Sequence, residues 1–162
     1  MTTIVASIAH GGMAADTRVT GAMVYYPASK LFRVGESIFG TSGHGDMCLA
    51  FIHWVKTSPK RDPMKLHELI GKEYDRDDIS ILELNPSGIF RWTGWGFPEH
   101  VLREADAVGS GAQAALEALN CGKGLEESVS RAMNHDEYTG CEVQVLYLDE
   151  PGASTKKRTT RK

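Results

Sequence analysis

The sequence predicts an α+β protein in which two antiparallel sheets lie face to face and helix pairs cover their outer faces, a four-layer αββα sandwich. Strand-like segments separated by glycine-containing turns indicate the antiparallel sheets. Helix-like segments occur in adjacent pairs, at 47–56 with 64–74 and at 112–119 with 125–133. Because a parallel sheet needs single helices alternating with strands, paired helices favour the antiparallel arrangement.

The expected strands form hairpins along the chain. A first hairpin joins residues 2–9 to 13–16 through the turn His10-Gly11-Gly12, and a second joins 30–34 to 37–40. Further segments with strand-like composition or alternation are 22–26, which Pro27 interrupts, 78–84, 89–93, 105–109 and 142–148.

The first helix of the chain is expected to begin near Asp46, because Leu49, Ile52 and Val55 recur at helical spacing. Its partner at 64–74 has room for about three turns. The two are separated by a loop that contains two prolines.

A chain of 162 residues can bury a sizeable core, and 41% hydrophobic with 24% charged residues is typical of globular proteins. We expect one domain over residues 1–150 and a basic, flexible tail over 151–162. Residues 152–162 carry five of the 18 basic residues and no acidic ones, so the rest of the chain is acidic. This distribution indicates a solvated end, and nucleic-acid binding is not expected.

The cysteines Cys48, Cys121 and Cys141 are odd in number and form no CxxC pair, which favours a reducing compartment, the cytoplasm. The apolar run at 4–9 is too short for a signal peptide or a membrane span. Six histidines show no metal-binding spacing, so we expect neither a metal nor another cofactor.

The amino terminus would combine a nucleophile with a base once Met1 is removed, which a small second residue permits. A strand beginning here would hold Thr2 in a sheet. Without such pairing, a chain end usually frays. Its α-amine, with a pKa of about 7.7–8.0, would be partly neutral near pH 7 and adjacent to the Thr2 hydroxyl. Such a pair is a known way to activate a hydroxyl nucleophile.

Six features of the chain occur in the order found in one family of hydrolases. They are Thr2, Asp16, Lys30, Ser42-Gly43, Gly109-Ser110-Gly111 and Asp136-Glu137-Tyr138-Thr139-Gly140. In this pattern the chain resembles the proteasome β-subunits and their bacterial proteasome-like relatives, which are N-terminal threonine hydrolases. The resemblance covers about nine tenths of the chain and implies the N-terminal nucleophile hydrolase fold.

The resemblance implies a catalytic role for each matched residue. Thr2 would attack a carbonyl carbon, while the charge of Lys30 favours the deprotonated hydroxyl and Asp16 orients Lys30. The Gly43 N–H would donate to the oxyanion. The residues expected to position the amine and its water are Ser110, Asp136 and Thr139. On composition alone, Lys30 would be an exposed surface lysine and Ser110 a helix cap.

The substrate expected from the resemblance is a peptide or an unfolded polypeptide. Val19, Ala28, Phe32 and Gly45 would line its site and favour a small or moderately apolar side chain before the cleaved bond. The resemblance also implies a homo-oligomeric ring. Because Pro59 and Pro63 shorten the first helix pair, we expect self-association without predicting stacked rings, and the sequence identifies no regulatory ATPase.

Three functions remain open from the sequence. The first is a threonine endopeptidase that forms an acyl-enzyme on Thr2. The second is a catalytically silent subunit of a proteasome-like ring, and the third is an amidohydrolase of a non-peptide amide, since a fold does not fix a substrate. The complete set of matched side chains favours the peptidase, whereas retention of Met1 would favour the silent subunit.

Overall fold

Two large antiparallel sheets form the centre of the molecule in the computed structural model, which describes residues 2–20 and 25–150. One sheet has the strand order β10-β1-β2-β11 and the other β5-β6-β7-β8-β9, while β3 and β4 form a separate ribbon. The strands are β1 (Thr3–Ser7), β2 (Gly12–Asp16), β3 (Arg18–Thr20), β4 (Tyr25–Pro27), β5 (Leu31–Val34), β6 (Ser37–Gly43), β7 (Ile79–Asn85), β8 (Gly88–Trp92), β9 (Pro98–Val101), β10 (Ala105–Gly109) and β11 (Val143–Tyr147).

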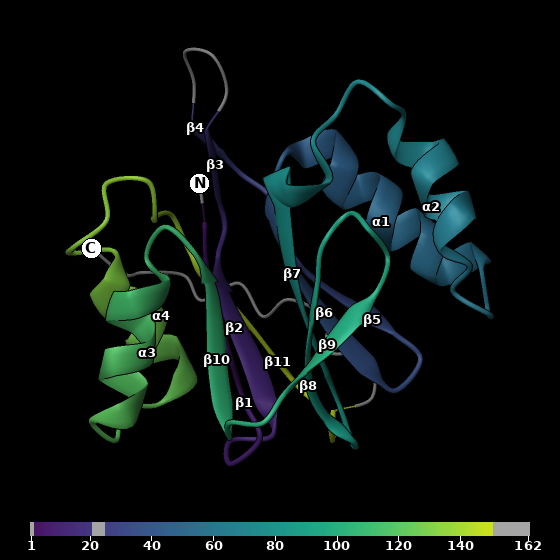
Figure 1. The fold of residues 1–162 in the computed structure, drawn as a ribbon. Helices are drawn as coiled ribbons and strands as arrows, with labels where there is room; N and C mark the ends of the chain where they lie inside the picture. The colour runs from purple at the N-terminus through teal and green to yellow at the C-terminus, as the bar shows by residue number, and fades with distance from the viewer. Residues whose placement is uncertain (1, 21–24, 151–162) are drawn as a thin grey trace.

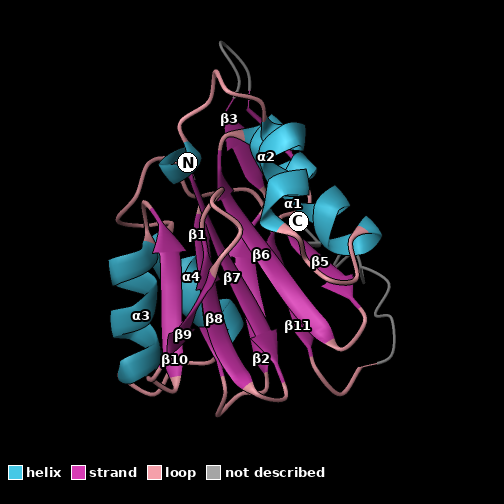
Figure 2. Cartoon of the chain, turned by 45° about the vertical axis from the view of Figure 1, so that its right-hand side comes forward, coloured by secondary structure: helices cyan, strands magenta, loops and turns pink. Residues whose placement is uncertain are grey.

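Helix pairs cover the outer faces of both sheets (Figure 1). The first pair, α1 (Gly45–Thr57) and α2 (Pro63–Ile70), packs on the five-stranded sheet and is followed by a 3-10 turn at Arg76–Asp78. The second pair, α3 (Ala112–Asn120) and α4 (Leu125–Ala132), packs on the four-stranded sheet. Figure 2 shows the two sheets stacked between these helices. The predicted αββα sandwich is therefore confirmed.

The alternation of side chains along β1 explains how one strand serves two apolar layers. Ile4 and Ala6 pack between the two sheets, whereas Val5 points to the other face and packs against α3 and α4. Since successive side chains of a strand face opposite sides, a strand buried on both faces must be apolar throughout. This requirement accounts for the continuous apolar run that opens the chain.

Gly40 allows the two sheets to approach closely where β6 crosses β1. A Cβ atom at this position would lie 2.6 Å from Ile4 Cγ2 and 2.7 Å from Met13 Sδ. The absent side chain thus lets β6 run close to β1. The start of β1 and the end of β6 lie at the same end of the sandwich.

The second helix is shorter than the predicted 64–74. Asp62 caps its start by accepting a hydrogen bond from the Met64 N–H at 3.0 Å, but the helix stops at Ile70 because Gly71 has a φ of +83°. The prediction overlooked this glycine as a stop signal. Tyr74 instead packs against His44, with ring centroids 4.9 Å apart and the ring planes tilted by 50°.

Two strand predictions also need correction. Pro27 does not interrupt a strand but ends β4, where it pairs with Arg18 in a two-stranded ribbon that tolerates a missing N–H. The edge strand β9 was not predicted, since it begins with Pro98 and has no apolar alternation. Most of the predicted strand at 22–26 lies outside the described residues.

No helix within residues 2–20 and 25–150 is long and apolar enough to cross a membrane. The three cysteines are free thiols. The tail predicted at 151–162 lies outside the part of the chain that the structure describes.

Candidate active site

Strand register brings the matched residues to one end of the sandwich. Ile4 pairs with Ala15 on β2, which places Asp16 beside Thr3, and Thr3 pairs with Gly109 on the other side. Ser110 follows directly after Gly109. Asp16 and Ser110 therefore approach the start of β1 from its two flanking strands.

Thr2 and Thr3 belong to the two different faces of β1. By the alternation seen at Ile4 and Val5, Thr2 lies on the side between the sheets and Thr3 on the side of α3 and α4. Thr2 lines an open cleft of about 650 Å³ together with Lys30 and Gly43. The predicted nucleophile, lysine and oxyanion glycine thus share one cavity.

Asp16 is completely buried, and its carboxylate accepts four hydrogen bonds. Oδ1 accepts from Lys30 Nζ at 2.9 Å and from the Thr3 N–H at 2.8 Å. Oδ2 accepts from the Arg18 N–H at 3.2 Å and from the Gly140 N–H at 3.1 Å. These four hydrogen bonds hold the carboxylate in one position, and the carboxylate in turn fixes where the Lys30 ammonium lies.

Lys30 is only 5% exposed. Burial lowers the pKa of Lys30 below its ordinary value, and Asp16 opposes that change by stabilising the charged form. A buried ammonium with one carboxylate partner can favour a nearby anionic oxygen, which is the role predicted for it.

A chain of hydroxyl groups joins Thr3 to Asp136. The Thr139 hydroxyl donates to Asp136 Oδ2 at 2.5 Å, and Thr3 Oγ1 lies 2.6 Å from Thr139 Oγ1. Because Thr139 has one proton and gives it to the carboxylate, Thr3 must be the donor to Thr139. Ser110 Oγ donates to the same carboxylate oxygen at 2.6 Å. Its distance to the Thr2 carbonyl oxygen is 3.5 Å, a much weaker contact.

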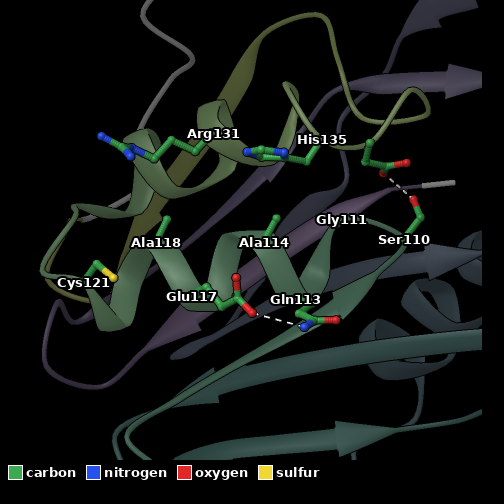
Figure 3. A pocket seen from close by; sticks show the side chains of 10 residues that line it. Ser110, Gly111, Gln113, Ala114, Glu117, Ala118, Cys121, Arg131 and His135 are labelled. Atoms are coloured by element: carbon green, nitrogen blue, oxygen red, sulfur yellow. Dashed lines mark hydrogen bonds between the residues drawn. The ribbon is translucent and has the colours of Figure 1, made fainter.

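Ser110 and Asp136 also line a shallow groove between α3 and α4 on the outer surface. Figure 3 shows Ser110 at one end of this groove, whose sides carry Gln113 and His135. The hydrogen bond between Ser110 and Asp136 therefore separates the groove from the start of β1.

Protonation of Asp136 gives a test of this hydroxyl chain. Burial alone would raise the pKa of Asp136, but hydrogen bonds from Ser110, Thr139 and the Tyr138 N–H hold it below its ordinary value. A depressed pKa contributes stability above the unfolded-state value of about 3.9, and this stability is lost as pH falls through the folded-state value. We expect urea unfolding to show a constant advantage of wild type over Asp136→Asn between about pH 5 and 7, shrinking below about pH 4.

The matched control for that measurement is Asp149→Asn, because Asp149 is an exposed aspartate outside the site. Asp149 takes no part in the hydroxyl chain, so at pH 7 Asp149→Asn should lie closer to wild type than Asp136→Asn does. An Asp136→Asn difference that is equal at pH 3 and pH 7 would contradict the predicted role of the carboxylate.

Gly43 and Gly109 hold the backbone on the two sides of Thr2 in conformations that favour glycine. Gly43 has a φ of +118°, and a Cβ there would lie 2.0 Å from the Asp78 carbonyl oxygen. Gly109 has a φ of +96°, and its Cβ would lie 1.9 Å from the Thr2 carbonyl oxygen. Both glycines are thus required by the backbone, independently of any oxyanion role.

Gly109→Ala is expected to displace Thr2 and destabilise the fold. The backbone conformation alone costs about 1–3 kcal/mol for a residue with a side chain, and the clash with the Thr2 carbonyl adds to it. Gly122→Ala is a matched control, since Gly122 has a φ of +80° but no atom within 4 Å of the added Cβ. Urea unfolding should show the larger loss for Gly109→Ala, and equal losses would refute the clash.

All four residues predicted to bind substrate, Val19, Ala28, Phe32 and Gly45, line the cleft that contains Thr2. Leu49, one of the three residues whose spacing predicts the first helix, also lines the cleft and is 62% exposed. Thr3 was missed as a site residue. The signal that could have found it is the period-two alternation of β1. This alternation puts the Thr3 side chain on the same face as Val5, where its hydroxyl meets Thr139.

Cys48 is a second side chain of the cleft with a potentially nucleophilic atom. Burial raises the pKa of Cys48 to about 11, against smaller opposing effects of Thr41 and Lys30. The thiol is therefore neutral near pH 7 and a poor nucleophile. Within the described residues, no three histidine, cysteine or acidic side chains form a possible metal site.

No family model and no curated protein matches the chain. Solved structures do resemble it. BPH from Thiobacillus denitrificans in complex with epoxomicin has a TM-score of 0.71 and 20% identity over 92% of this chain and 100% of that chain. Eukaryotic HslV from Trypanosoma brucei has a TM-score of 0.65 and 18% identity over 90% of this chain and 98% of that one.

Anbu, the ancestral beta-subunit from Yersinia bercovieri, has a TM-score of 0.67 at 10% identity and covers 90% of this chain and 80% of its own. At these identities the similarity concerns the fold. The chain thus has the N-terminal nucleophile hydrolase fold of proteasome-like proteins, and the resemblance predicted from its motifs is confirmed at that level.

Proposed function

We propose that this protein is a threonine peptidase whose nucleophile is Thr2, exposed by removal of Met1. The observation that carries the proposal is the shared cleft of Thr2, Lys30 and Gly43, in which Lys30 is held by a buried carboxylate at 2.9 Å. The fold of BPH, HslV and Anbu agrees with it. The cleft is also open enough to admit an extended peptide, with a volume of about 650 Å³.

In the proposed first step, the Thr2 hydroxyl gives its proton to the Thr2 α-amine and its oxygen forms a bond to the peptide carbonyl carbon. The carbonyl oxygen becomes an oxyanion, for which the Gly43 N–H is the proposed donor. The carbon–nitrogen bond then breaks, and the leaving amine takes the proton from the α-ammonium. The product is an ester between Thr2 and the acyl half of the substrate.

In the second step, water attacks the ester carbon and gives a proton to the α-amine. The bond to the Thr2 oxygen breaks, and that oxygen takes the proton back, which restores the hydroxyl and releases a carboxylic acid. Lys30 stays protonated throughout and stabilises the negative charge that develops on the Thr2 oxygen. Ser110, Asp136 and Thr139 are proposed to keep the start of β1 and the amine in place.

The experiment that tests the function is cleavage of a panel of peptide amides by purified protein whose intact mass has been measured. Loss of Met1 together with cleavage of at least one apolar or small-residue substrate is the expected result. Met1 retained on the whole population would exclude the Thr2 amine as a base and support a silent subunit. Cleavage of non-peptide amides alone would support the amidohydrolase.

We also propose that the protein self-associates into a ring-like homo-oligomer. Four large apolar side chains are exposed on α2 and the loop that contacts it, namely Met64, Leu69, Trp95 and Phe97. Aromatic residues and methionine are enriched in subunit interfaces, and the Yersinia bercovieri neighbour is named as a beta-subunit. Sedimentation velocity at micromolar concentration should give a single large species, and a monomer would contradict the proposal.

A further inference from the structure

We propose that Gln144 is a positioning residue for Lys30, acting through a side-chain amide that takes the place of a missing strand neighbour. Gln144 lies on β11, the edge strand of the four-stranded sheet, and Lys30 directly precedes β5, the edge strand of the other sheet. The catalytic use of Lys30 rests on the proposed peptidase function, whereas its placement by Gln144 does not.

The amide of Gln144 pairs with the backbone of β5 as a peptide group would. Gln144 Oε1 accepts from the Leu31 N–H and the Lys30 N–H, each at 3.2 Å. Gln144 Nε2 donates to the Leu31 carbonyl oxygen at 3.2 Å and to Ser29 Oγ at 2.9 Å. An edge strand presents unpaired N–H and C=O groups, and here one side chain satisfies both groups of Leu31.

The same region of β11 also holds the partner of Lys30. Val143, the residue before Gln144, pairs with Asp16 in the sheet register. Val143 is thus the strand neighbour of Asp16. The side chain of the next residue, Gln144, binds the backbone of Lys30. Because Lys30 Nζ must cross from one sheet to the other to reach Asp16 Oδ1, the spacing between the sheet edges decides whether it arrives at 2.9 Å.

Other contacts also act on this segment. On the inner side of the edge, the Thr41 N–H donates to the Lys30 carbonyl oxygen at 3.0 Å, and that bond fixes Lys30 relative to its own sheet.

Two further contacts join neighbouring residues to the opposite sheet. The Ala28 N–H donates to the Thr17 carbonyl oxygen at 2.7 Å, and the Arg33 guanidinium donates to the Tyr147 carbonyl oxygen. The Gln144 amide differs from both because it binds the backbone of Lys30 itself.

The test replaces Gln144 by methionine, which has similar length but no amide, and by asparagine, which keeps the amide but is one methylene shorter. Gln113→Ala is the matched control, since Gln113 is the other glutamine of the chain, is exposed and donates a hydrogen bond to Glu117 at 3.1 Å, away from both sheet edges. Thermal unfolding first establishes that each variant is folded. If Gln144→Met does not fold, Gln144→Asn serves as the test variant.

Nuclear magnetic resonance gives a readout that needs no catalysis. Both Gln144 variants should accelerate hydrogen exchange of the Leu31 amide by about tenfold, the factor that corresponds to the net free energy of one lost hydrogen bond. They should also broaden or abolish the ¹⁵N signal of the Lys30 ammonium, because its protons exchange faster with water when Asp16 no longer holds it. Gln113→Ala should leave both signals at their wild-type values.

If wild type cleaves peptides, both Gln144 variants should lower kcat by about 10–100-fold, as small misplacements of a catalytic group do, with KM nearly unchanged. A wild-type Lys30 signal in folded variants would overturn the proposal, whatever the activity. So would a rise in KM at constant kcat, which would place Gln144 in substrate binding. Absence of activity in wild type would count against the peptidase alone, since the Lys30 signal would still decide the role of Gln144.

Discussion

Thr2→Ala should abolish peptide cleavage, with kcat falling by about 10⁴-fold or more, as removal of the nucleophile does in serine proteases. The alanine variant keeps the α-amine and the strand but has no oxygen to form the ester. Because the Thr2 side chain lines the cleft and is not part of the apolar core, loss of the hydroxyl should leave the fold intact. Initial rates on the best peptide amide, with the intact mass of both proteins, measure the effect.

Thr2→Ser is the informative comparison, because it retains the hydroxyl and lacks one methyl group. It should keep a measurable rate, and on short incubation its mass should rise by the same acyl group as that of wild type. Equal residual cleavage by wild type and Thr2→Ala would exclude Thr2 as the nucleophile.

Local patterns were sufficient to predict most of the elements and much of the site. The turn at His10-Gly11-Gly12 predicts the first hairpin, and that hairpin alone places Asp16 near the start of β1. The two glycines of the Gly109-Ser110-Gly111 motif mark where the chain turns from β10 into α3. Such features depend on backbone sterics within a few residues, so they are readable without tertiary information.

Contacts between the sheets could not be predicted in the same way. Gln144 and Lys30 are 114 residues apart, and the alternation of β11 does not reveal that the Gln144 amide faces another sheet edge. Leu49 shows a second limit of local patterns. Its helical spacing with Ile52 and Val55 correctly predicts the helix, but the spacing does not reveal that only Ile52 and Val55 are buried, while the turn that carries Leu49 faces the open cleft.

Asp16→Asn should weaken both stability and catalysis. An amide offers one acceptor oxygen in place of two, so at least one of the four donors around residue 16 would face an NH₂ group. Breaking a buried ion pair by removing one partner costs about 3–5 kcal/mol. Burial would then lower the pKa of Lys30 further, because Asp16 no longer opposes it, and loss of its positive charge should reduce kcat by about 10²-fold or more.

Asp106→Asn separates these two effects. Asp106 is equally buried and pairs with Arg91 at 2.7 Å and Arg103 at 3.1 Å, but it lies opposite Ala6, toward the other end of β1. Urea unfolding should show a loss for both variants, while only Asp16→Asn loses kcat at pH 7. Lys30→Met, which leaves Asp16 with its three backbone donors, should lose kcat with a smaller loss of stability. If Asp106→Asn and Asp16→Asn reduce kcat equally, the Lys30–Asp16 pair acts through global stability and has no specific part in the chemistry.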